Sequence, residues 1–245
     1  MIDSRRLAYL EALGVDVYVR RSPPPAPAEA EPRAEPMASV AATSSGPPPA
    51  ESRLDWESLR AAVAGCTRCA LSETRTQTVF GVGHPKARWM FIGEAPGAEE
   101  DKRGEPFVGR GGQLLTAMLK AIGFRREDVY IANVLKCRPP GNRDPRPDEA
   151  AHCRGYLERQ IEFVSPALVI AVGRIAAQNL LATDAPLARL RGQVHALGPR
   201  GWPLVVTYHP AYLLRSPAEK RKAWQDLLLA RSVFGWLQRG EQVLP

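Results

Sequence analysis

The stretch ARWMFIGEAPGAEED, residues 87–101, places a run of apolar residues directly before a turn rich in Gly, Pro and acidic residues. A short apolar run bounded by such a turn is typical of a strand that is buried on both faces. Three further runs share this character, and stretches with helical periodicity separate and follow them. The predicted strands are Ala87–Ile92, Val129–Val134, Ala167–Val172 and Leu204–Thr207, and the predicted helices are Gly112–Ile122, Pro147–Phe163, Arg174–Leu181 and Pro217–Leu237. This alternation predicts an α/β fold, a three-layer α/β/α domain with a central four-stranded, mainly parallel sheet.

The N-terminal part of the chain differs in composition from the rest. Residues 1–21 are expected to form a short helical segment, because their leucines recur near helical spacing. Residues 22–50 are rich in Pro and Ala and hold too few apolar side chains to offset the entropy lost on ordering, which predicts a disordered linker. The folded domain is predicted over residues 51–245, and Asp55 is suited to cap its first helix.

The overall composition is that of a globular protein, with 44% hydrophobic and 24% charged residues among 245. No apolar run is long enough to span a membrane, and the N-terminus lacks the apolar core of a signal peptide. We therefore expect a cytoplasmic protein with no membrane partner. The excess of 33 Lys and Arg over 26 Asp and Glu favours a polyanionic partner such as nucleic acid.

Polar side chains follow the predicted strands at the points where the strands end. Glu94 comes after the first strand, Asn133 closes the second, and His209 follows the fourth. Because parallel sheets bind ligands at the carboxyl ends of their strands, these side chains are expected on one rim. Helix capping would explain any one of these loops, but a carboxylate, an amide and an imidazole together suit the stabilisation of a developing anion. Neither a GxGxxG fingerprint nor a GxxxxGK[ST] phosphate loop is present.

Four cysteines form a second candidate site. Cys66 and Cys69 make a CxxC pair before the first strand, Cys137 follows the second strand, and Cys153 lies on the next predicted helix. In a cytoplasmic protein four cysteines favour a metal or redox site over disulfides. Four thiolates suit either zinc or an iron–sulfur cluster. The wide separation of the second pair favours the cluster, but spacing alone leaves both open.

Several motifs together point to a known family. GEAPGAEED (93–101), GEPFVGRGGQLL (104–115), VYIANVLKCRPPGNRDPRPDE (129–149) and HPAYLLR (209–215) resemble the family 4, iron–sulfur uracil-DNA glycosylases of the uracil-DNA glycosylase superfamily. The resemblance runs from about residue 54 to the C-terminus and includes all four cysteines. It implies a monofunctional enzyme that hydrolyses the N-glycosidic bond of uracil in DNA during base excision repair. It also implies one [4Fe-4S] cluster per chain, bound by Cys66, Cys69, Cys137 and Cys153.

The same resemblance implies the residues of a uracil pocket. The backbone of the first loop, Glu94 to Pro96, approaches the base, and Phe107 stacks on the base. Asn133 pairs with N3–H and O4 of the uracil, and His209 donates to its O2. Glu100 is a candidate for blocking the C5 position, and which of the two glutamates positions the water stays open. The uracil-binding candidates are Glu94, Ala95, Pro96, Phe107, Asn133 and His209, and the catalytic candidates are Glu94, Glu100, Asn133 and His209.

The DNA contacts follow from the same likeness. The segment Ala211 to Arg215 is expected to be a loop, in which Leu213 or Leu214 would fill the gap that a flipped base leaves in the stack, with Arg215 near phosphate. The DNA-binding candidates are Arg110, Arg143, Leu213, Leu214 and Arg215. A related branch bonds covalently to DNA through a loop histidine, and residues 140–145 contain none, so turnover is expected.

The expected partner is uracil-containing DNA, single- or double-stranded, bound by a nucleoid-associated monomer. The Pro-rich segment is expected to bind a repair or replication protein. The alternative is a non-catalytic iron–sulfur DNA-binding or polymerase accessory protein, which would not need Asn133 and His209 on one rim. A zinc deaminase is disfavoured, since the chain lacks its HxE and PCxxC motifs.

Overall fold

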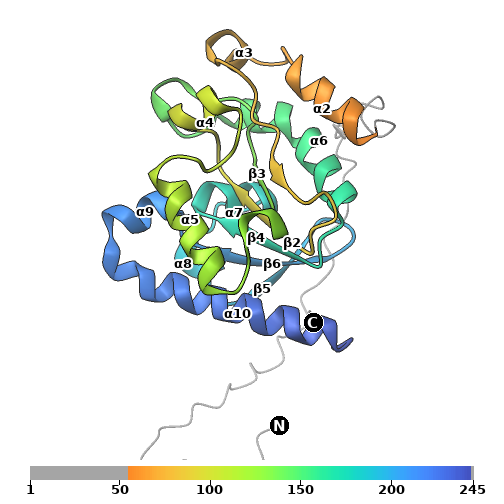
Figure 1. Ribbon diagram of the computed structural model, residues 1–245, viewed down its shortest axis with the longest axis vertical. Helices are drawn as coiled ribbons and strands as arrows, with labels where there is room; N and C mark the ends of the chain where they lie inside the picture. Colours follow the sequence, from red (N-terminus) through yellow and green to blue (C-terminus); the bar gives the residue numbers. More distant parts are fainter. Residues whose placement is uncertain (1–54, 244–245) are drawn as a thin grey trace, which may run out of the picture. The chain divides into compact units, whose positions relative to one another are not determined.

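The computed structural model describes residues 55–243, and the predictions for residues 1–21 and 22–50 lie outside this range. Figure 1 shows a central sheet with helices on both sides. The sheet has six strands in the order β1-β3-β2-β4-β6-β5. The predicted α/β class with three layers is therefore confirmed, while the strand count needs correction.

The four predicted strands form the parallel centre of the sheet. They are β2 (Trp89–Gly93), β3 (Tyr130–Asn133), β4 (Leu168–Val172) and β6 (Trp202–Thr207), joined by parallel pairing. The prediction of four strands missed the two edges, where β1 (Val82–Gly83) and β5 (Val194–Leu197) pair antiparallel with β3 and β6. Both are hard to detect because β1 has two residues and β5 is mostly half-exposed, so neither has a long apolar run.

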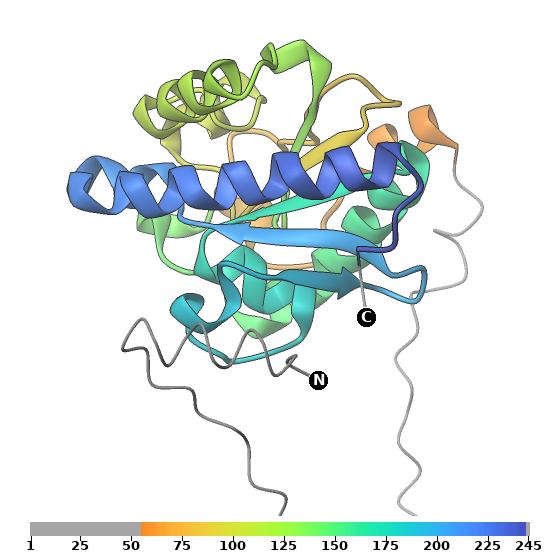
Figure 2. The ribbon, with the colours of Figure 1, turned by 90° about the horizontal axis from the view of Figure 1, so that it is seen from below.

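Helices cover both faces of the sheet because each buried strand sends alternate side chains to opposite sides. Phe91 packs with α5 (Arg110–Ala121) and α10 (Lys220–Gln238), whereas Ile92 packs with α6 (Pro147–Val164) and α7 (Arg174–Leu181). Figure 2 shows the long α10 running along the sheet. All four helices agree with predicted ones to within a few residues at their ends.

The remaining helices are short and position loops. Asp55 caps α2 as predicted, accepting a hydrogen bond from the Ser58 N–H at 2.7 Å. The segment expected to be a loop after His209 is instead the helix α9, whose N-cap is His209 and whose first residue is Pro210. The short helices are α2 (Trp56–Ala64), α3 (Leu71–Thr74), α4 (Ala98–Arg103), α8 (Leu187–Leu190) and α9 (Pro210–Arg215), with 3₁₀ turns at Arg126–Asp128, Pro140–Asn142 and Pro217–Glu219. Within residues 55–243, every helix is too short or too polar to cross a lipid bilayer.

Candidate active site

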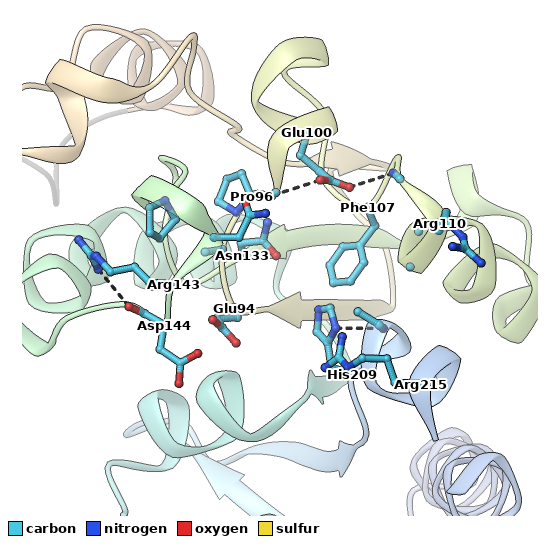
Figure 3. A pocket seen from close by; sticks show the side chains of 18 residues that line it. Glu94, Pro96, Glu100, Phe107, Arg110, Asn133, Arg143, Asp144, His209 and Arg215 are labelled. Carbon is cyan, nitrogen blue, oxygen red and sulfur yellow. Dashed lines mark hydrogen bonds between the residues drawn. The ribbon is translucent and has the colours of Figure 1, made fainter. Parts of the chain in front are cut away.

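A pocket of about 440 Å³ opens where β2, β3 and β6 end. Figure 3 shows its side chains, which come from the turns after β2, β3 and β6, from the loop before α5, and from α4, α5, α9 and the end of β3. All predicted uracil-binding, catalytic and DNA-binding residues line it except the two leucines. Its lining comprises Glu94, Ala95, Pro96, Gly97, Glu100, Phe107, Gly109, Arg110, Gly111, Gly112, Asn133, Pro139, Asn142, Arg143, Asp144, His209, Ala211 and Arg215.

Asn133 lies at the back of the pocket because it is the last residue of β3, in register with Gly93 at the end of β2. The side chain is buried, and its Oδ1 has no hydrogen-bond partner within the described chain. A buried acceptor left unpaired costs about 1–3 kcal/mol. The Asn133 amide is therefore suited to a ligand that brings its own N–H donor.

Phe107 forms a wall of the pocket in a conformation that two glycines permit. A Cβ at Gly93 would lie 2.5 Å from both Asn133 Oδ1 and Phe107 Cζ, so only glycine lets the amide and the ring meet there. A Cβ at Gly112 would lie 1.8 Å from the Phe107 carbonyl oxygen. Phe107 itself has φ of +53°, which is unfavourable for an aromatic residue. Such strain is common at ligand sites, where the surroundings fix the side chain.

Glu100 connects two of the pocket loops. One carboxylate oxygen accepts the N–H groups of Val108 and Gly109 at 2.8 and 3.0 Å, and the other accepts the Gly97 N–H at 3.1 Å. Both oxygens are thus engaged by the backbone. Glu100 orders the first loop against the loop that carries Phe107.

The Glu94 carboxyl has a raised pKa. Burial, helped by the nearby Asp144 and opposed by Arg174, raises its pKa to about 7. No hydrogen bond from residues 55–243 contributes to this shift. Near neutral pH the carboxyl can therefore gain or lose its proton and is free to bind a water.

His209 is held in one tautomer by its place at the start of α9. Its Nδ1 accepts the Ala211 N–H at 3.2 Å, so the proton of the neutral ring lies on Nε2. Burial, together with the charge of Arg215, lowers the pKa of His209 to about 4. The ring lies 5.5 Å from that of Phe107, centroid to centroid. At neutral pH His209 is an uncharged hydrogen-bond donor.

The predicted DNA-binding residues divide into two groups. Arg110, Arg143 and Arg215 line the pocket, although Arg143 is also paired to the buried Glu149 through two contacts of 2.5 and 2.9 Å. Leu213 is 1% exposed and is packed inside the domain, so its prediction as a wedge is wrong. Leu214 is 37% exposed and remains available for that role.

Two charged residues of this region were not selected from the sequence: Asp144, which lines the pocket, and its partner Arg174. Arg174 follows the glycine turn at the end of β4, and its Nη2 donates to Asp144 Oδ2 at 2.8 Å. Both groups act on the pKa of Glu94. The position of Arg174 directly after a strand end was the signal that could have found it.

The four cysteines line one further cavity. They come from the segment between α2 and α3, from the chain after β3, and from α6. Arg75 Nη1 donates to Cys137 Sγ at 3.0 Å, and the buried Lys136 also lines this cavity. In residues 55–243 no three His, Cys, Asp or Glu side chains form a group that could hold a metal ion. The four thiols thus share a cavity without forming a single-ion site.

A sequence model described as the Uracil DNA glycosylase superfamily matches residues 80–228. The chain belongs to the uracil DNA glycosylase superfamily. A type-4 uracil-DNA glycosylase of Archaeoglobus fulgidus is 48% identical over 170 residues, which cover 67% of this chain and 85% of that relative. One from Thermotoga maritima is 44% identical over 69% of this chain and 90% of that relative, and a type-5 enzyme of Thermus thermophilus is 32% identical over 54% and 68%.

Family membership confirms the predicted resemblance and the predicted class of enzyme. In this member of the superfamily the cysteine cavity also suits the expected cofactor. Four thiols line it, and the Arg75 guanidinium donates a hydrogen bond to one of them. An iron–sulfur cluster with four thiolate ligands is anionic, so this cation fits such a group.

Proposed function

We propose that the chain is a uracil-DNA glycosylase that hydrolyses the bond between uracil and deoxyribose. The observation that carries this proposal is the unpaired Oδ1 of Asn133, facing a pocket that also contains a neutral His209. Uracil offers an N–H between two carbonyl groups. The Asn133 amide can accept from N3–H and donate to O4, while the Phe107 ring stacks on the base.

Bond cleavage leaves negative charge on the uracil and positive charge on the sugar. The Nε2–H of His209 would donate to uracil O2 as its charge develops, which is the arrangement that lowers such a barrier. The Glu94 carboxylate would orient the attacking water and stabilise the sugar cation. Glu100 is bound to three backbone N–H groups, which favours Glu94 over Glu100 for the water.

Glu100 would instead act by holding two pocket loops in place. It holds the first loop beside the stacking ring, and we propose that the loop edge it fixes blocks a methyl group at C5 of the base. Thymine would then be excluded by shape. The proposal needs no charge change at Glu100.

The base must leave the helix to reach the pocket. Leu214, exposed on α9, would fill the vacated space, and Arg110 and Arg215 would contact phosphates on either side. Arg143 would support the loop through Glu149 and add to the positive rim. The enzyme would act as a monomer in repair of deaminated cytosine, associated with the nucleoid. A repair protein bound by the Pro-rich segment stays a prediction.

Cys66, Cys69, Cys137 and Cys153 would hold one [4Fe-4S] cluster. When bound, such a cluster supplies a cross-link between segments that are distant in sequence, and it can also carry an electron. In this chain the cross-link would join the start of the domain to the segment after β3 and to α6. We assign it a structural role, fixing the loop that follows Asn133.

The proposal is tested by incubating the purified holoprotein with an oligonucleotide that contains one deoxyuridine. The expected products are free uracil and an uncleaved strand with an abasic site, from single-stranded and from U·G substrates. A matched oligonucleotide with thymine should be left intact. A protein with a full iron complement that binds these DNAs equally and releases nothing would instead be a binding module without chemistry.

A further inference from the structure

A second cavity, of about 310 Å³, adjoins the uracil pocket. It lies between the turn after β4 and the helix α9, and we call it the Tyr212 cavity. It shares Glu94, Asp144, His209 and Arg215 with the first pocket and adds Arg174, Tyr208 and Tyr212 among its lining. The two cavities are therefore neighbours, close enough for adjacent nucleotides of one strand to occupy both.

Tyr212 presents an aromatic ring to solvent in a fixed place. It is 37% exposed and stacks on Tyr208 with ring centroids 5.2 Å apart and 19° between planes. The Arg191 guanidinium lies 4.3 Å from the centre of the Tyr208 ring. Arg191 is held in turn by two 2.8 Å contacts to the buried Asp226. The stack is therefore anchored in the domain while its outer member stays accessible.

The charges of the Tyr212 cavity suit a phosphate. Arg215 lines both cavities, and Arg174 is half-exposed in the second. Arg174 neutralises Asp144 by their 2.8 Å pair, and the raised pKa of Glu94 leaves that carboxyl partly uncharged near pH 7. The excess charge of the cavity is positive. An accessible ring beside arginines is the arrangement by which proteins hold single-stranded nucleic acid.

We propose that the Tyr212 cavity binds the nucleotide next to the flipped deoxyuridine, with the neighbouring base stacked on Tyr212 and the connecting phosphate on Arg215 and Arg174. This inference rests on the proposed function. It explains how a single strand can be held in register without a complementary strand. Stacking needs no particular base, so the site tolerates any sequence around the uracil.

The test uses single-stranded oligonucleotides with one deoxyuridine, in which the base on its 5′ or its 3′ side is replaced by an abasic spacer. For one of these two substrates the holoenzyme should show a KM raised about 10-fold or more, with kcat nearly unchanged. Tyr212→Ala should raise KM for the complete oligonucleotide by the same factor and lose its sensitivity to that spacer. Tyr212→Phe keeps the ring and should behave as the parent enzyme.

Trp236→Ala is the matched control, because Trp236 is also 37% exposed but lies on α10 and lines neither cavity. It should retain the full response to the spacer. The proposal is overturned if the parent enzyme treats both spacer substrates like the complete one, or if Tyr212→Ala still discriminates between them. Uracil release from the complete oligonucleotide in the same assay shows that the proposed function stands when this inference fails. If no uracil is released at all, the dissociation constants of the same oligonucleotides, measured by fluorescence anisotropy, still report on stacking.

Discussion

The proposed uracil pocket and the cysteine cavity border the same segment, residues 133–137, but they differ in how their polar groups are paired. In the pocket, Asn133 Oδ1 has no hydrogen-bond partner among residues 55–243, and the Glu94 carboxyl has a raised pKa. Four residues after Asn133, Cys137 receives a hydrogen bond from Arg75. Between them, the buried Lys136 donates to the Asn133 carbonyl oxygen at 2.8 Å and to Gln160 Oε1 at 2.6 Å.

This contrast distinguishes a site that binds and releases a ligand from a site that holds a bound group permanently. Unpaired groups that face a pocket gain their partners only from a ligand that enters and leaves. A guanidinium already placed beside a thiol suits an anionic group that stays bound. Lys136 belongs to both regions, because it lines the cysteine cavity and supports the backbone of Asn133. The predictions below separate the two regions.

The largest effect is expected from removing the groups that are proposed to contact uracil. Asn133→Ala and His209→Ala should each lower kcat about 10²- to 10³-fold, because each deletes a donor to an atom that becomes negative in the transition state. Iron content should not change, and the melting temperature should stay within a few degrees of the parent value. Single-turnover uracil release, iron analysis and thermal unfolding measure these quantities. A variant that loses iron along with activity would show that the two regions are not separable.

The second effect concerns stability. Cys153→Ser should lose the cluster and with it the cross-link, lowering the melting temperature by roughly 10 °C or more. Metal removal by a chelator under reducing conditions should do the same to the parent protein. The parent should be brown and the variant colourless. An iron-free variant that melts like the parent would contradict the structural role of the cluster.

The third effect is a change in pH dependence. Burial places the pKa of Glu94 near 7, so the carboxylate that orients water forms as the pH rises from 5 to 8. The rate should rise with pH through this range and then level off. His209 is neutral throughout, since its pKa is about 4, and adds no second transition. Glu94→Gln should lower kcat about 10- to 100-fold and flatten the profile. A profile that keeps its shape in this variant would exclude Glu94 as its source.

The smallest effect should come from Glu100→Gln. The variant keeps one acceptor oxygen and loses charge-assisted bonds to the backbone, which should lower the free energy of unfolding by about 1–3 kcal/mol. Urea unfolding measures this change. KM should rise more than kcat falls, because the loops that shape the pocket loosen. An unchanged unfolding midpoint would show that these hydrogen bonds do not order the loops.

Much of the fold was predictable because the four central strands are continuous apolar runs. The edges were not, since pairing at β1 depends on long-range contact with β3 and has no pattern of its own. The helix α9 was mistaken for a loop because Pro at its first position resembles a turn signal.

Glu94, Asn133 and His209 could be chosen because strand ends converge on one edge of a parallel sheet. Phe107, Glu100 and the DNA-binding candidates, in contrast, were implied only by the family resemblance. The sequence could not predict which side chains already have hydrogen-bond, ion-pair or packing partners in the folded domain. The three backbone partners of Glu100, the burial of Leu213 and the pairing of Arg174 with Asp144 all depend on the packed domain. The Tyr208–Tyr212 stack likewise needs the helical turn of α9 to bring the rings together.

A crystal structure of the protein soaked with free uracil tests the central claim most directly. The base should lie between Phe107 and the first loop, with N3–H directed at Asn133 Oδ1 and O2 at His209 Nε2. Uracil bound elsewhere, or a pocket in which Asn133 Oδ1 is already paired to the protein, would contradict the account.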